Sequence, residues 1–556
     1  MEAKLKQNNW ILVFSSVIIL FLYLGYRGLW TCEGRWAEVT REMLLTHDFF
    51  HPTINGSPYF DKPLLTYWII AIVSWITGHL NELSVRIPSA VAGLVALFAT
   101  YSLGKRLWSK QIALISCWFL LTTYGFLFWA RTGTADMENM AAVILAVSFY
   151  WARRETPSFS DFLIFYLICL IGSLFKGLTA FVCPILAILP DILLSKKIKK
   201  YLNFSNIAAL IIAAIIYLAP FIYAALTSKG YKENGLFMVF RENIERYIHP
   251  FDHRLPFYCY IYYLPMLMIP WVPLWIGALI KKIKEWKNLN YSDKWVLLAC
   301  ALIFIFFTLS GSRRSYYILP ILPFCCLITA SAIVDAFKDR STIIEIAELC
   351  QVVILAIVAV VCALSPFIWP ILKSHYSFVA TAYLKASTLI IGILSIIAIL
   401  AYILLPDMLG NIFSLPGRIS AMIICSLIIM AGFFIWETNA IEAYRTQKPF
   451  ALSLKVYSQG IPSYDTAFYK KVSANVIFYL DLPKPVTVLH SIEETKAFLK
   501  LKDENRVFVI RRRDYYKIYK FLSKNLKETP DIEEQVFPWD KNPGKKLMAW
   551  YLPNNS

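Results

Sequence analysis

The sequence predicts a polytopic α-helical membrane protein with about thirteen transmembrane helices and a small external α/β domain. The chain has 556 residues, of which 58% are hydrophobic and 16% aromatic, and its mean hydropathy is +0.55. Apolar runs of about 20 residues, the length that crosses a bilayer as a helix, recur from Trp10 to Phe434. The short alternating segments of a transmembrane β-barrel are missing from the sequence.

The formal net charge of +18 fits the same class. Cytoplasmic loops of membrane proteins collect Lys and Arg, and anionic headgroups attract them, so the charge indicates membrane lipids and not nucleic acid as partners. Most of the 11 cysteines lie inside apolar runs and none follows residue 436, so no disulfide framework is predicted. No CxxC or HExxH spacing indicates a closed metal site.

Hydropathy marks fourteen candidate helical segments. The first follows Lys4 and Lys6 and is too long for a cleavable signal peptide, so we interpret it as a signal anchor with a cytoplasmic N-terminus. In chain order the segments are 10–30, 64–78, 84–104, 110–129, 137–152, 160–176, 178–194, 206–226, 257–280, 295–311, 316–336, 350–373, 384–405 and 418–436.

Charge distribution reduces the fourteen segments to thirteen spans. Segment 64–78 is short, follows Lys62-Pro63 and carries Tyr67, Trp68 and Trp75, as expected of an interfacial helix on the outer leaflet. The basic clusters at 105–110, 153–154, 196–200 and 281–287 then all face the cytoplasm. The loops 31–83, 131–136 and 227–256 and the region after 436 face outward.

Residues 437–556 have the pattern of a small α/β domain outside the membrane. Apolar runs shorten to strand length at Ala474–Leu480 and Arg506–Ile510, and helical patterns cover 491–501 and 515–526. The basic run Arg511-Arg512-Arg513 is interpreted as a solvated charge cluster, with a lipid-phosphate contact as the alternative.

Cations at the outward ends of the spans oppose the positive-inside trend. A single Arg near a helix end can reach water by itself, but a whole set of such cations indicates a phosphate at the membrane surface, which Arg and Lys bind by charge-assisted hydrogen bonds. The candidate phosphate ligands are Arg35, Lys62, Arg131, Lys176, Arg246, Arg313 and Arg314.

The outward loops also carry acids that suit sugar transfer, in which a carboxylate can take the acceptor proton. Glu33 follows the first span directly and is the favoured functional acid, whereas Glu38 fits a structural role better. Asp136 begins a span, where a helix N-cap is the alternative. His249 and His253 have metal-compatible chemistry without a diagnostic spacing, so a divalent metal is left open.

These residues resemble the motifs of GT-C type glycosyltransferases, which use lipid-linked sugars. The chain looks closest to bacterial aminoarabinose transferases that modify lipid A, within the protein-mannosyltransferase-like superfamily. The matching motifs are Glu33-x-Arg35-Trp-Ala-Glu38, Tyr59-Phe-Asp61-Lys62-Pro63, Ala130-Arg131-x-x-x-x-Asp136, Phe175-Lys176-Gly177, Arg241-Glu242-x-x-x-Arg246-Tyr247 and Ser310-x-Ser-Arg-Arg-x-x-Tyr317-Ile-Leu-Pro320.

The resemblance implies a transmembrane glycosyltransferase domain over 1–436, with catalytic outward loops 31–83, 130–136 and 227–256, and a periplasmic α/β domain over 437–556. It implies an undecaprenyl-phosphate sugar donor, with Glu33, Asp136 and Asp61 as the acids of the site. Lys62, Lys176, Arg35 and Arg313 or Arg314 would contact the donor phosphate, and Tyr59 and Tyr317 would line the site. Three positions depart from the family pattern, namely Cys32, Asp61 and Asn243, where relatives usually carry Asp, Glu and His.

Three functions remain in competition at this stage. The first is an inverting glycosyltransferase of the bacterial inner membrane that moves aminoarabinose from a polyprenyl phosphate to lipid A. The second is transfer of another sugar to a protein or other glycan by the same fold. The third is a lipid or solute transporter, although transporters place their ionisable groups near the membrane midplane and not at one surface.

Overall fold

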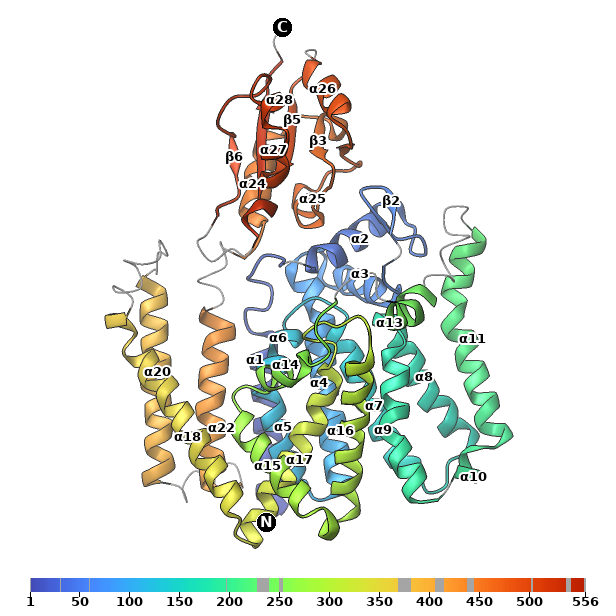
Figure 1. The fold of residues 1–556 in the computed structure, drawn as a ribbon, viewed down its shortest axis with the longest axis vertical. Coiled ribbons are helices and arrows are strands. Elements are labelled where there is room, and N and C mark those ends of the chain that lie inside the picture. The colour runs from blue at the N-terminus through green and yellow to red at the C-terminus, as the bar shows by residue number, and fades with distance from the viewer. Residues whose placement is uncertain are drawn as a thin grey trace.

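The protein is described by a computed structural model, which covers residues 2–30, 32–59, 61–196, 198–227, 240–249, 254–368, 382–405, 415–437, 445–501, 504–536 and 542–554. Most helices run side by side in one bundle, with the N-terminus at one end and a small sheet, followed by the C-terminus, at the other (Figure 1). The helices of the N-terminal half are α1 (Glu2–Phe21), α2 (Glu33–Thr46), α3 (Leu65–Thr77), α4 (Glu82–Leu107), α5 (Lys110–Leu121), α6 (Tyr124–Ala130), α7 (Asp136–Arg153), α8 (Phe159–Lys176), α9 (Thr179–Leu194), α10 (Ile198–Tyr201) and α11 (Phe204–Thr227).

The second half of the bundle begins with a short segment at 241–248. It consists of η2 (Arg241–Glu245), α13 (Arg246–Ile248), α14 (Cys259–Met268), α15 (Val272–Lys284), η3 (Trp286–Asn288), α16 (Tyr291–Leu309), η4 (Leu319–Ile321), α17 (Leu322–Lys338), α18 (Thr342–Ala363), α20 (Ala382–Leu404), α22 (Gly417–Ala431) and η5 (Gly432–Glu437). All fourteen predicted apolar segments overlap these helices in the described residues. The helix of the predicted segment 10–30 ends at Phe21, and that of the predicted segment 350–373 begins earlier, at Thr342.

The bundle is that of an integral membrane protein. Within the described ranges, eight helices are long and apolar enough to cross a bilayer, and ten spans result if each of two bent helix pairs counts as one. Shorter apolar helices lie at Trp10–Phe21, Leu65–Thr77 and Thr179–Leu194. The number thirteen therefore stays a prediction.

Two predicted single spans are broken helices. α5 and α6 meet at 65°, where the hydroxyls of Thr122 and Thr123 donate to main-chain carbonyls of the preceding turn, at 2.7 Å and 2.6 Å. α14 and α15 meet at 118° around Pro270, which lacks the N–H that a continuous helix needs. Both breaks lie beside each other, since the Trp271 indole donates to the Thr122 hydroxyl at 2.9 Å.

Helix α3 is the predicted interfacial helix. Tyr67 and Ile70 are buried on one face, while Ile72, Trp75 and Ile76 are exposed on the other. It lies with α2 across the sheet-facing end of the bundle (Figure 1). An exposed face of Trp and Ile suits the membrane interface, and its depth in a membrane stays a prediction.

The C-terminal region forms a five-stranded mixed sheet in the order β4-β3-β5-β7-β6. β3 pairs in parallel with β4 and β5, and β7 pairs antiparallel with β5 and β6. Alternate residues of β5 enter two separate cores, because Val507 and Val509 face one side and Phe508 and Ile510 the other. The elements are α24 (Lys448–Tyr457), η7 (Ser463–Asp465), β3 (Thr466–Tyr469), α25 (Ala474–Leu480), β4 (Thr487–Leu489), α26 (Ile492–Lys500), β5 (Arg506–Arg511), α27 (Arg512–Lys517), α28 (Tyr519–Leu522), β6 (Ile532–Glu533), η8 (Pro543–Lys545) and β7 (Leu547–Leu552).

The strand predicted at Ala474–Leu480 is wrong, because this run is helix α25. Asn475 to Leu480 are all buried, and a continuous short apolar run does not distinguish a fully buried strand from a fully buried helix. The strand predicted at 506–510 and the helix predicted at 491–501 are confirmed by β5 and α26. The helix predicted at 515–526 is two short helices, α27 and α28.

Helix α25 joins the sheet to the facing end of the bundle. Its Tyr479 hydroxyl donates to Glu82 at 2.9 Å and accepts from the Leu29 main-chain N–H at 2.6 Å. Gly34 of α2 approaches Asn475 so closely that an added Cβ would come within 2.0 Å of its side chain. The apolar core between them is shared, since Trp36 and Val476 belong to one buried cluster. The division at 436/437 therefore stays a prediction.

Candidate active site

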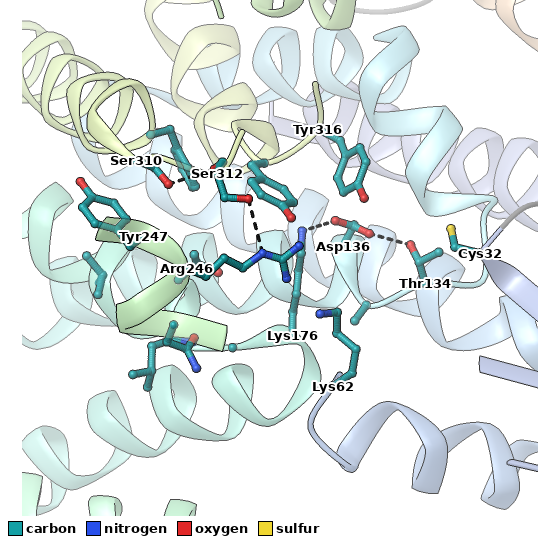
Figure 2. Close-up of a pocket in the computed structure, with 18 of the residues that line it drawn as sticks. Cys32, Lys62, Thr134, Asp136, Lys176, Arg246, Tyr247, Ser310, Ser312 and Tyr316 are labelled. Carbon is teal, nitrogen blue, oxygen red and sulfur yellow. Dashed lines mark hydrogen bonds and ion pairs between the residues drawn. The ribbon is translucent and has the colours of Figure 1, made fainter. Parts of the chain in front are cut away.

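A cavity of about 300 Å³ lies at the sheet-facing end of the bundle. Its walls come from the beginning of α2, the loop after β2 (Ser57–Pro58), the beginning of α7, the turn between α8 and α9, the η2–α13 segment and the turn before η4 (Figure 2). β2 pairs with β1 (Thr53–Ile54) in a short hairpin. Segments far apart in the sequence therefore supply the polar groups of one site.

Asp136 and Lys176 form an ion pair in this cavity. Asp136 is the first residue of α7 and Lys176 the last of α8, positions at which the helix dipoles stabilise a carboxylate and an ammonium group respectively. Lys176 Nζ donates to Asp136 Oδ1, and Thr134 Oγ1 donates to Asp136 Oδ2 at 2.9 Å. Asp136 is not the N-cap, a position that Ala135 occupies.

Two tyrosines surround the lysine of this pair. Lys176 Nζ lies 5.0 Å from the ring centroid of Tyr316 and 4.8 Å from that of Tyr317. Aromatic faces attract an ammonium group, so the two rings hold the Lys176 head group within the cavity. The predicted lining role of Tyr317 agrees with its position in the wall, and Tyr316 joins it there.

The turn after Lys176 depends on a glycine. Gly177 has a φ of +138°, which side chains rarely tolerate, and a Cβ on it would lie 2.6 Å from Asn243 Oδ1. The same Asn243 oxygen accepts the Leu178 main-chain N–H at 2.7 Å. Asn243 therefore ties the η2 segment to the turn that positions Lys176.

Arg35 and Lys62 enter the cavity from the first outward loop. Arg35 Nη1 donates to the Tyr59 hydroxyl at 3.0 Å, and that hydroxyl donates to Asp61 Oδ2 at 3.0 Å. Arg35 also lies 3.6 Å from Asp61, but the two side chains are 44% and 54% exposed, so this pair is weak. Burial raises the pKa of Tyr59 and keeps it a neutral donor.

Arg246 enters from the opposite wall. Its Nε donates to Ser312 Oγ at 3.4 Å, and Ser310 Oγ donates to the Ser312 carbonyl at 2.9 Å. Tyr247 connects this wall to α16 and the turn after it. Its carbonyl accepts a hydrogen bond from the Gly311 N–H at 2.7 Å, and its ring stacks on that of Phe306 with 5.1 Å between the ring centroids. In Figure 2, Arg246 and Lys62 point towards the Lys176–Asp136 pair.

The charge of the cavity is strongly positive. Its described lining contains four cationic side chains, and Asp136 is the carboxylate among them. At the boundary with an apolar medium such a surplus favours an anionic ligand with several oxygen acceptors, which phosphate provides. The four cations are Arg35, Lys62, Lys176 and Arg246.

Glu33 lies behind the cavity and not in its lining. Arg86 donates a hydrogen bond to each carboxylate oxygen of Glu33 at 2.7 Å. The main-chain N–H groups of Trp30 and Gly133 also donate to Glu33, at 2.8 Å and 2.6 Å. Burial alone would raise the pKa of Glu33, but Arg86 and these donors hold it below the ordinary value. The geometry gives Glu33 a structural position, and its catalytic role stays a prediction without support from its contacts.

Four further predicted site residues lie outside the cavity lining. Arg131 donates to the carbonyls of Ile19, Leu20 and Leu22 and so caps the C-terminal end of α1. Arg313 donates to the carbonyls of Leu255 and Thr308. Arg314 lies 5.9 Å from the Tyr316 ring. Asp61 contacts the lining residues Tyr59 and Arg35 through its carboxylate, and its main-chain carbonyl accepts a hydrogen bond from Lys62 Nζ at 2.7 Å.

Sequence reasoning missed Arg86, the residue that fixes Glu33. The signal was present, because Arg86 is a charge inside the predicted span 84–104, and such a charge requires a buried partner. Glu38, expected to be structural, is buried and bound by Arg41 at 2.7 Å and 2.8 Å. Also missed were the lining residues Trp36, Tyr67, Thr134, Thr179, Tyr247, Phe306 and Phe307.

Within the parts of the chain that the structure describes, no three His, Cys, Asp or Glu side chains gather closely enough to hold a metal ion. His249 is exposed at the end of α13. His253 lies outside the described residues, as do 228–239 and 250–252 of the predicted outward loop, and the metal is left open.

The sequence resembles known enzymes over the half that builds this site. Residues 61–223 match the family described as dolichyl-phosphate-mannose-protein mannosyltransferase. An undecaprenyl phosphate-α-4-amino-4-deoxy-L-arabinose arabinosyl transferase of Erwinia tasmaniensis is 30% identical over 330 residues, which are 57% of this chain and 58% of that protein. Its counterpart in Aeromonas salmonicida is 31% identical over 354 residues, 60% and 61% of the two chains. The matched part thus spans about 60% of these relatives, and the resemblance drawn from the motifs is confirmed.

The fold is similar over nearly the whole chain. The crystal structure of ArnT from Cupriavidus metallidurans bound to undecaprenyl phosphate superposes with a TM-score of 0.73, covering 98% of both chains at 17% identity. The apo structure of that protein gives 0.67. These comparisons show the predicted fold, a GT-C-like helical membrane protein with a small sheet domain. Together with the apolar helices, the relatives indicate an integral inner-membrane protein.

Proposed function

We propose that the protein is an inverting glycosyltransferase that moves 4-amino-4-deoxy-L-arabinose from undecaprenyl phosphate to lipid A at the outer face of the bacterial inner membrane. The observation that carries this proposal is the cationic cavity, in which Arg35, Lys62, Lys176 and Arg246 surround a single carboxylate. The names of the relatives supply the sugar and the lipid carrier. The N-terminus would then be cytoplasmic and the sheet domain periplasmic.

The reaction breaks the bond between the anomeric carbon and a phosphate oxygen of the donor. The departing polyprenyl phosphate gains negative charge as this bond breaks, and Lys62 and Lys176 are the groups that would stabilise it. Arg246 would bind the donor phosphate before the reaction begins. The acceptor oxygen attacks the anomeric carbon from the opposite face, which inverts its configuration. Arg35 would hold the acceptor or the sugar at the α2 side of the cavity.

The contacts of Asp136 favour an acceptor that is already ionised. Asp136 is engaged by Lys176 and Thr134, so both of its oxygens already accept hydrogen bonds, and an acceptor hydroxyl would have to compete with these donors. A lipid A phosphate needs no proton removed before it attacks, whereas a protein or sugar hydroxyl does. We therefore favour lipid A over a hydroxyl acceptor.

The test is mass spectrometry of lipid A from a strain that makes the undecaprenyl-phosphate aminoarabinose donor but lacks its own transferase. Expression of this chain should add a pentosamine-sized mass to lipid A. Lys62→Ala should strongly reduce the addition, while Lys105→Ala, which removes an exposed cation at the far end of α4, should not. An unchanged lipid A despite normal membrane levels of the protein would refute the lipid A acceptor.

Asp136→Asn separates the two acceptor classes. For a phosphate acceptor, the loss in rate should stay near tenfold, which reflects only the altered partner of Lys176. A hydroxyl acceptor would require Asp136 as general base, and the loss would then reach about 10²–10⁴-fold. Rates would be measured with purified protein and donor, and protein or glycan acceptors would be tried beside lipid A.

A further inference from the structure

A second cavity of about 260 Å³ lies among α7, α8, α9, α10 and α11. It is at the opposite ends of the helices that build the first cavity, because α7 runs from Asp136 in the first site to Arg153 in the second. α8 runs the other way, from Phe159 near the second cavity to Lys176 in the first. Helices of this length span about 27 Å, close to the thickness of a bilayer core, so the second cavity faces the other membrane surface.

The walls of this cavity are almost entirely hydrocarbon and aromatic. Two of its tyrosine hydroxyls are engaged with protein groups, since Tyr201 donates to Tyr150 at 3.1 Å and Tyr150 donates to Asp191 at 2.6 Å. Water gains little in such a space, whereas an acyl chain replaces lipid contacts by protein contacts. The apolar wall consists of Phe149, Phe162, Phe165, Ile185, Ile188, Leu189, Ile192, Ile198 and Leu202.

The rim of the cavity is basic. Arg153 lines it with a 62% exposed side chain that meets Asp161 at 3.5 Å, a distance and exposure typical of a weak pair. Arg154, in contrast, is already occupied by protein groups, because it forms an ion pair with Asp191 and its guanidinium lies 3.8 Å from the centroid of the Trp151 ring. Lys196 is exposed on the turn between α9 and α10, and Lys199 is exposed in α10, next to the lining residue Ile198.

We propose that this second cavity binds one anionic phospholipid of the bilayer, with an acyl chain between α8 and α9 and the phosphate at Arg153 and Lys199. An apolar slot that opens beside cations at a membrane surface is complementary to both ends of such a lipid. The bound lipid fixes α10 against α7 and α8 at the membrane face opposite the first cavity. Neither the reaction nor its site depends on this assignment.

Native mass spectrometry of the full-length protein in detergent tests the proposal. Phosphatidylglycerol and phosphatidylcholine with identical acyl chains are added separately, and the lipid-bound fraction is measured. One phosphatidylglycerol should be retained about five-fold more than phosphatidylcholine, the ratio expected for about one basic contact to an anionic headgroup. Arg153→Gln should reduce this preference to below about two-fold.

Filling the slot is the second arm of the experiment. Leu189→Trp, or the smaller Ile185→Phe if the tryptophan variant is not produced, should reduce the binding of both lipids. Lys284→Gln, an exposed cation at the end of α15 and outside the cavity, should change neither. Equal retention of the two lipids by the wild type, or a preference that survives both variants, overturns the proposal. So does displacement of phosphatidylglycerol by undecaprenyl phosphate, which would assign the slot to the tail of the donor.

Discussion

Glu33 and Asp136 are two acids at the same end of the bundle, and their surroundings differ completely. Glu33 accepts four hydrogen bonds, two from Arg86 and two from main-chain N–H groups, and is 1% exposed. Asp136 has Lys176 and Thr134 as its hydrogen-bond partners and lies in the wall of the cavity. A carboxylate whose acceptor sites are filled by the protein serves the fold, whereas one that faces an open volume beside cations can serve a ligand.

The comparison also explains how the two regions cooperate. Glu33 binds Arg86 of α4 and the Gly133 N–H, and Gly133 lies three residues before Asp136. The first outward loop is thereby joined to the turn that begins α7. Helix α25 contacts the same segment through Tyr479 and Asn475. The structural acid thus positions the walls that the functional acid and its cations occupy.

Glu33→Gln should cause the largest loss of stability. The variant leaves the Arg86 guanidinium buried without its counter-charge, which costs about 3–5 kcal/mol. The purified protein should unfold at a markedly lower temperature in a thermal shift assay. Asp136→Asn is the matched variant, and its unfolding temperature should change far less.

A double replacement tests whether Glu33 acts only through Arg86. Glu33→Leu with Arg86→Met removes both charges, and replacing a buried pair by apolar groups is often neutral. The double variant should regain only part of the stability that Glu33→Gln loses, and part of the activity. The carbonyls of Leu24, Arg27 and Gly28 still lose their Arg86 donors, and the N–H groups of Trp30 and Gly133 lose their Glu33 acceptor. Restored stability with no activity at all would instead give Glu33 the catalytic role that the sequence predicts.

Lys176→Met should cause the largest loss of activity at nearly constant stability. Removing one preorganised group that stabilises developing charge costs about 10²–10³ in rate, or about 2.7–4 kcal/mol. The loss should appear in kcat, because charge on the leaving phosphate develops in the transition state. An effect on KM alone would show that Lys176 binds the ground state only.

The sequence predicts the membrane helices more completely than it predicts the residues of the site. Apolar runs locate the membrane helices because each run must match the bilayer thickness. Two motif residues at helix ends were assigned to the site and do line it, namely Asp136 at the beginning of α7 and Lys176 at the end of α8. Arg131 and Arg313 occur in the same motifs, but they bind main-chain carbonyls at helix ends, a use of Arg that spacing does not reveal. Contacts between distant segments, such as Glu33 with Arg86, needed the fold.

Arg246→Lys should have a moderate effect that is confined to binding. A lysine keeps the charge but loses the planar fork, which binds a phosphate through two hydrogen bonds. KM for the donor should rise about tenfold, since one hydrogen bond to a charged group contributes about 1.5 kcal/mol, while kcat should change little. An equal fall in kcat would place Arg246 among the groups that act in the transition state.

The smallest expected effect is on the pH dependence of stability, and it separates the two acids again. The pKa of Glu33 is held below its ordinary value in the folded protein, so the unfolded chain binds the proton more tightly. Its contribution to stability is therefore complete above the ordinary pKa of about 4.3 and decreases as the pH falls through the folded value. Thermal unfolding between pH 6 and about 3.5 should show the wild type losing more stability than Glu33→Gln, which has no carboxylate to protonate there. Parallel curves would mean that Arg86 holds its partner equally well in both protonation states, and the charge of Glu33 would then not be what secures the first outward loop.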